Sequence, residues 1–132
     1  MGRYTSFAKN AAQERDGVPL RAAFIELLVL LWQDNEPDQV DALWLMMAQR
    51  PNSFTADALD VLAAIADNPP DDLLDLMRTH GWISLYHLHA DESQTRYTLE
   101  EAVAWLRATH DRFKVVHEAE HPKPDSRQAR QR

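Results

Sequence analysis

The sequence from residue 81 to residue 101 reads GWISLYHLHADESQTRYTLEE and breaks the helical period of the rest of the chain. Residues 82–89 alternate apolar and polar side chains, residues 90–94 are polar turn material, and residues 95–98 return as a second strand. Thr98 and Glu101 then supply the Thr-x-x-Glu pattern of a helix capping box. These signals predict a β-hairpin between two helices.

Two helices are expected early in the chain. The first covers about residues 19–33 and is apolar on nearly every side, which predicts a central core helix. The second runs from Pro37, a residue that suits the first turn, to about Gln49. Apolar side chains at residues 44–47 surround this second helix, so we expect it to be largely buried as well.

Three more helices flank the predicted hairpin. One is expected over about residues 56–66, with Thr55 as its N-terminal cap and an apolar side opposite an acidic one. The next is expected from Asn68 to Gly81, because asparagine caps helices and glycine ends them. The last follows Thr98 and is expected to end near His117.

The chain is therefore expected to be mainly α: one compact helical domain over residues 1–120, with about five helices and one β-hairpin between the last two. Residues 121–132 contain four basic groups, one acid and two prolines, with no apolar side chain larger than Ala129. This composition predicts a disordered basic tail.

Composition excludes several classes of site. The 132 residues include no cysteine, which rules out a thiolate zinc site, an iron–sulfur cluster and a cysteine nucleophile. The net charge of −7 argues against general affinity for nucleic acid or anionic membrane, because such affinity depends on Lys and Arg. The apolar run at residues 27–32 is too short to span a bilayer, and we expect a cytoplasmic protein.

The order of elements over about residues 55–106 resembles a winged helix. Residues 73–83, LLDLMRTHGWI, are similar to the end of a recognition helix that passes into the first wing strand in MarR- and PadR-type regulators. Residues 96–102, RYTLEEA, are similar to the second wing strand and the start of the next helix. The resemblance implies a DNA-binding transcription regulator.

The charges at the positions that would face DNA disagree with this implication. The expected recognition helix carries several aspartates, and Arg78 is its residue that would favour DNA binding. The hairpin turn carries two more acidic residues, Asp91 and Glu92. Each carboxylate would repel the phosphate backbone. The winged-helix regulator is therefore kept as the alternative function.

Six aspartates, which we call the aspartate face, form the main candidate site. They are Asp57, Asp60, Asp67, Asp71, Asp72 and Asp75. Two interpretations stay open: a solvated face that keeps the protein in solution, or a docking surface whose negative potential attracts a basic partner. Trp82 and Tyr86 are the candidate apolar anchors of such an interface.

His87 and His89 share one face of the expected strand and would need a third ligand to hold a metal, so exposed polar positions are the simpler interpretation. The sequence lacks Gly-x-Ser-x-Gly, a glycine-rich phosphate loop and His-Glu-x-x-His. We therefore expect no enzyme, no cofactor and no metal.

These observations together favour a non-enzymatic protein-binding module. The class that fits size and acidity is an inhibitor of the immunity or antitoxin kind, which masks a basic toxin or nuclease sterically and electrostatically. The partner's identity and a homodimeric state are left open by the sequence.

Overall fold

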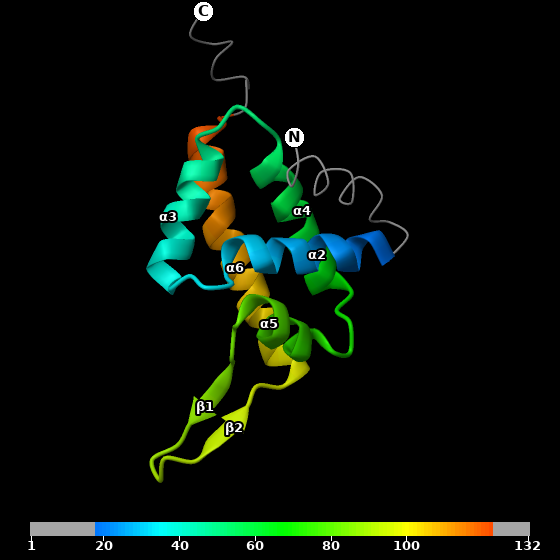
Figure 1. Ribbon diagram of the computed structural model, residues 1–132, viewed down its shortest axis with the longest axis vertical. Coiled ribbons are helices and arrows are strands. Elements are labelled where there is room, and N and C mark those ends of the chain that lie inside the picture. Colours follow the sequence, from blue (N-terminus) through cyan, green and yellow to red (C-terminus); the bar gives the residue numbers. More distant parts are fainter. Residues whose placement is uncertain (1–17, 123–132) are drawn as a thin grey trace, which may run out of the picture.

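The computed structural model describes residues 18–122, and in that range it contains five helices and a two-stranded antiparallel hairpin between the fourth and fifth of them (Figure 1). The elements are α2 (Val18–Leu31), α3 (Pro37–Ala48), α4 (Phe54–Asp67), α5 (Leu73–Gly81), β1 (Tyr86–Leu88), β2 (Gln94–Arg96) and α6 (Leu99–Glu120). The mainly helical class with a late hairpin is confirmed. Nearly all of the expected basic tail lies outside the described residues.

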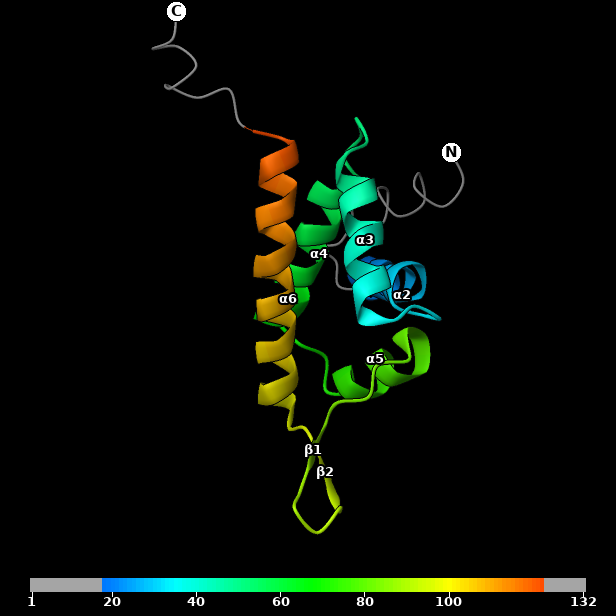
Figure 2. The same cartoon turned by 90° about the vertical axis from the view of Figure 1, so that its left-hand side faces the viewer.

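The helices form a body from which the hairpin projects (Figures 1 and 2). The long helix α6 runs along one side and packs on α4, α3 and α5, while α2 crosses the body and packs on α4 and α5. In the hairpin, Tyr86 pairs with Arg96 and Leu88 with Gln94. All six strand residues are exposed, so the hairpin contributes little to the core.

An aromatic stack holds α2, α3 and α6 together. The Phe113 ring of α6 stacks on Trp44 of α3, with centroids 4.2 Å apart and planes 11° apart. Trp32, which follows α2, stacks on the same ring at 5.8 Å. The Trp44 indole N–H also donates to the Phe113 carbonyl oxygen at 2.9 Å, which satisfies a buried donor.

Thr55 is not the cap of α4, as the sequence predicted, because the helix begins one residue earlier at Phe54 and its N-terminal cap position is Ser53. Thr55 is fully buried, and its hydroxyl is hydrogen-bonded to His117 Nδ1 at 2.7 Å. The long-range partner on α6 explains why a residue typical of caps lies inside the helix.

The second helix is less buried than expected. Trp44 and Met47 are 1% exposed, but Leu45 and Met46 are 41% and 44% exposed. One side of α3 packs on α4 and α6, and the opposite side faces solvent despite its apolar residues.

The fourth helix starts later than the sequence predicted, at Leu73 rather than near Asn68. Pro69 and Pro70 keep the preceding backbone out of the helical region, and the Leu73 N–H donates to the Pro70 carbonyl in a turn. The helix ends at Gly81, as expected.

Both strands are shorter than the alternating pattern suggested. Residues 82–85 lead out of α5 rather than joining β1, since the Ile83 N–H donates to the Met77 carbonyl. At the tip, Asp91 accepts hydrogen bonds from the side chain and backbone of Ser93, which lower its pKa. Glu92 takes a left-handed conformation with φ of 68°.

The start of α6 agrees with the predicted capping box: the Glu101 N–H donates to Thr98 Oγ1 at 3.1 Å, and the Thr98 N–H donates to Glu101 Oε1 at 2.9 Å. The helix extends beyond His117 to Glu120. His121, at the start of the expected tail, stacks on His117 and bonds the Ala48 carbonyl.

We predict that Trp44→Phe lowers the free energy of unfolding by about 2 kcal/mol, because it removes a buried hydrogen bond and part of the stack on Phe113. Denaturant unfolding measures the change. Leu45→Ala on the exposed side of α3 is the control and should change stability by about 0.5 kcal/mol or less. Equal effects of the two variants would contradict the assigned core.

His117 makes stability depend on pH. Burial first, and then the neighbouring His121, lower its pKa below the ordinary value of 6.5. The folded state therefore binds fewer protons than the unfolded state, so this contribution is present at neutral pH and is lost as the pH falls through 6.5 and below. We predict a shallower loss of stability between about pH 7.5 and 5.5 in His117→Gln, measured by urea unfolding. Identical pH dependence of the unfolding free energy in wild type and His117→Gln would contradict this role of His117.

Candidate functional site

Three carboxylates of the aspartate face are held by arginines of the same chain. Asp72 accepts two hydrogen bonds from Arg21, at 3.1 and 2.6 Å, and this pairing lowers its pKa. The remaining two pairs join Asp75 to Arg96 at 2.7 Å and Asp67 to Arg107 at 3.1 Å. The negative potential of this face is therefore smaller than its sequence suggests.

The other three aspartates differ in their surroundings. Asp57 is half-buried and accepts from Ser53 Oγ at 3.0 Å; burial raises its pKa, although the Ser53 bond opposes the rise. Asp60 and Asp71 are exposed. Their role in docking stays a prediction.

Trp82 combines exposure with an unusual backbone. Its side chain is 60% exposed, and it ends α5 in the left-handed region with φ of 57° and ψ of 32°. Glycine is the usual residue at such a position, and a larger residue there costs about 1 kcal/mol. Trp82 thus lies where stability alone favours glycine.

The neighbouring Gly81 explains why a tryptophan occupies the left-handed position after α5. It is buried inside the last turn of α5, where an added Cβ would lie 3.1 Å from side-chain atoms of Leu28 and Ile83. The glycine therefore serves close packing of α5 against α2, and the left-handed position falls on the next residue, Trp82.

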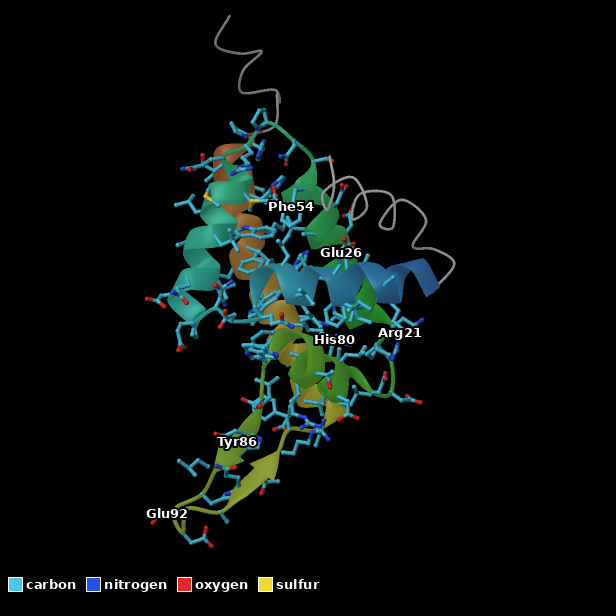
Figure 3. All side chains as sticks on the ribbon, viewed as in Figure 1. Arg21, Glu26, Phe54, His80, Tyr86 and Glu92 are labelled. Atoms are coloured by element: carbon cyan, nitrogen blue, oxygen red, sulfur yellow. The ribbon has the colours of Figure 1, made fainter. Side chains whose placement is uncertain are left out.

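The second exposed aromatic, Tyr86, lies on the projecting hairpin, between His80 of α5 and the tip at Glu92 (Figure 3). It is 45% exposed, and Leu88 on the same strand is 69% exposed. Since residues two apart on a strand share a face, these two side chains form a small apolar surface on the hairpin. The sequence analysis selected Tyr86 but not Leu88.

Trp82 lines a groove of about 770 Å³, which we call the tryptophan groove. Its lining comes from the α2–α3 turn, the segment after α5 and the middle of α6, and includes Trp32, Trp82 and Trp105. Carboxylates Asp34, Glu36 and Asp41 also line it, with Arg112. An aromatic surface and acidic groups therefore meet at one place.

Asp34 has the same backbone feature as Trp82. It follows α2 with φ of 67°, and Asp34, Trp82 and Glu92 are the non-glycine residues with positive φ in the described part of the chain. Two of these three line the groove. Aspartate tolerates a positive φ but tryptophan rarely adopts one, so the strained position is Trp82, and the groove that it lines is the leading candidate site.

The α2 and α5 ends are tied together beside the groove. Gln33 Nε2 donates to the His80 carbonyl oxygen at 3.1 Å, and Asn35 Nδ2 donates to the Leu31 carbonyl at 2.9 Å. The negative ends of two helix dipoles therefore lie close to Asp34 and Trp82. The N-terminal end of α3, the positive end of its dipole, also lies here. Glu36 is the N-cap residue of α3, and Asp38 lies in its first turn.

The hairpin histidines bind neighbours within the chain. His87 Nε2 lies 2.7 Å from Glu101 Oε2, and its ring stacks on Tyr97 at 4.7 Å. His89 Nε2 lies 2.6 Å from Thr95 Oγ1. Within residues 18–122 no group of three or more His, Asp or Glu side chains is arranged to hold a metal ion.

A second, smaller hollow of about 430 Å³ lies between α5 and the hairpin. Arg78, Arg96, Gln94 and Tyr86 line it, which is the region that a winged helix would present to DNA. Asp75 lies between the two cations, 2.7 Å from Arg96 and 4.0 Å from Arg78. This carboxylate offsets part of the positive charge.

Comparison of the chain with protein-family models, curated proteins and solved structures gave no match. Among the helices of residues 18–122, none has the length and apolar character needed to cross a membrane. The functional assignment therefore depends on the geometry of the chain itself.

Sequence reasoning selected Trp82 but missed the rest of the groove. Asp34 and Trp105 belong to segments that pattern analysis treats separately, and only the packing of α2, α5 and α6 brings them together. The clue in the sequence is a bulky tryptophan placed directly after the glycine that was expected to end a helix.

We predict that Trp82→Gly is about 1 kcal/mol more stable than Trp82→Ala. Both variants lose the indole, but only glycine relieves the left-handed backbone. Urea unfolding of the two variants measures the difference. Equal stabilities would contradict the left-handed conformation at this position.

Proposed function

We propose that the protein is a non-enzymatic module that binds a basic protein partner, and that it acts as an inhibitor of the immunity or antitoxin kind. In this function it covers the positive surface of a toxin or nuclease. A nuclease needs such a surface to hold its substrate, so covering it blocks activity sterically and electrostatically.

The observation that carries the proposal is Trp82. An exposed tryptophan in a strained conformation lowers stability, and binding accounts for its presence beside acidic groups. Tryptophan is also among the residues that contribute most to protein interfaces, because one side chain buries a large area with little loss of conformational freedom.

Charge and shape have separate roles in this proposal. The net charge of −7 accelerates association with a cationic protein over long range. Short-range affinity comes from Trp82, from the hairpin surface of Tyr86 and Leu88, and from the carboxylates of the tryptophan groove. Exposed members of the aspartate face contribute to the field rather than to the contact.

Affinity capture with the full chain from a lysate of the source organism, treated or untreated with nuclease, supplies the partner for the test. The purified partner is then titrated against wild type and Trp82→Gly. We expect capture of a basic protein in both lysates and an affinity at least about 30-fold lower for the variant. Equal affinity of the variant and wild type would contradict the proposal.

The double variant Asp60→Asn/Asp71→Asn is the matched control for charge. Both residues are exposed and neither lines the groove. We expect a slower association rate and a weaker salt dependence, with a dissociation rate close to that of wild type. A dissociation rate raised as much as in Trp82→Gly would place the contact on the aspartate face instead.

DNA binding by a winged helix is the second candidate, favoured by the order of elements and by Arg78 and Arg96 in the hollow beside the hairpin. It makes a different prediction in the same capture experiment. Recovered DNA that disappears after nuclease treatment, and whose binding is lost in Arg78→Gln/Arg96→Gln, would favour this candidate over the inhibitor.

A further inference from the structure

We propose that the tryptophan groove is a binding site for an arginine side chain of the partner, with the guanidinium stacked on an indole and paired with Asp34. The inference rests on the proposed function and deepens it, because it names the chemical group that the site recognises. The groove takes the arginine from an exposed segment of the partner.

The chain's own Arg112 shows how this region holds a guanidinium. Its guanidinium carbon lies 5.3 Å from the centre of the Phe113 ring, and its Nε and Nη2 donate to Asp41 at 3.3 and 3.2 Å. An aromatic face below and a carboxylate beside it are the two groups that a planar, charged fork prefers. Arg112 and Asp41 both line the groove.

The groove contains a second aromatic and acidic set beside this pair. Trp82 and Trp105 line it, and indoles are the aromatic rings that attract cations most strongly, while Asp34 provides a carboxylate. Within residues 18–122, Asp34 forms no salt bridge, in contrast to Asp41. A guanidinium from outside the chain would complete this second set as Arg112 completes the first.

The backbone at the groove adds to its negative charge. The C-terminal ends of α2 and α5 meet there and carry partial negative charge, while Glu36 and Asp38 offset the positive N-terminal end of α3. Asp34 and Trp82 lie at these two ends in left-handed conformations, and both line the groove. Aspartate tolerates this conformation, so the strain lies at Trp82, the residue that supplies an indole for stacking.

The size of the groove is compatible with this occupant. A volume of about 770 Å³ is within the range of sites that enclose small organic groups. It exceeds one guanidinium, so neighbouring residues of the partner segment also enter. Arginine is favoured over lysine because a planar group stacks on an indole and pairs with a carboxylate at the same time.

The test uses three blocked pentapeptides, Gly-Ser-X-Ser-Gly, in which X is arginine, citrulline or lysine. Citrulline keeps the shape of arginine without its charge. Tryptophan fluorescence and NMR titration of the full chain measure affinity at fixed ionic strength. We expect the citrulline peptide to bind at least about tenfold more weakly than the arginine peptide, with lysine between them.

Asp34→Asn is the decisive variant, because asparagine also tolerates the left-handed conformation and so keeps the backbone. It should weaken binding of the arginine peptide several-fold and leave citrulline binding unchanged. The control Glu120→Gln removes one negative charge outside both the groove and the aspartate face and should bind like wild type. Equal weakening by both variants, or equal binding of arginine and citrulline, would overturn the inference.

The two proposals fail separately. If a basic partner binds in a Trp82-dependent manner but the peptides show no preference for arginine, the groove inference is wrong and the proposed function stands. If the arginine peptide binds as expected but the lysate yields no basic protein, the site is supported and the proposed function is wrong.

Discussion

The rest of the structure depends on the stacking of two tryptophans, Trp32 and Trp44, on the Phe113 ring. Trp44 stacks on one region of it and Trp32 on another, so one side chain of α6 fixes both the end of α2 and the middle of α3. The short connection between these helices, residues 32–36, is thereby held against α6. Trp105, one wall of the tryptophan groove, packs at 6.0 Å from Trp32 and belongs to the same cluster. The core thus builds the groove directly.

Close packing at Gly81 accounts for the position of Trp82, which lines the same groove. Because Gly81 packs close to Leu28 as the last residue of α5, the left-handed position that follows the helix falls on Trp82. The result is a large aromatic group that is exposed, conformationally strained and next to carboxylates. A residue chosen for stability alone at position 82 would be glycine. In the proposed function, partner binding by Trp82 accounts for the tryptophan at this position.

The helices and the hairpin were predictable because they follow local signals: periodicity, the prolines that begin or interrupt helices, and the capping box at Thr98. The errors have tertiary causes, such as Thr55, which pairs with His117 on a distant helix instead of capping α4. The candidate site was only partly predictable. Composition drew attention to the aspartate face, but partners remote in sequence, such as Arg21 for Asp72, offset three of its charges. Asp34 became a candidate site residue only through the structure, which places it in the same groove as Trp82.

The four tryptophans provide a direct readout of the central claim, that the partner binds at the strained tryptophan and not on the aspartate face. Each indole N–H gives one signal in a two-dimensional NMR spectrum, and Trp44 lies in the core as an internal reference. On addition of the purified basic partner, we expect large shifts of the Trp82 and Trp105 indole signals and an unmoved Trp44. Unchanged Trp82 and Trp105 signals, together with shifts confined to backbone amides of residues 57–75, would contradict the account.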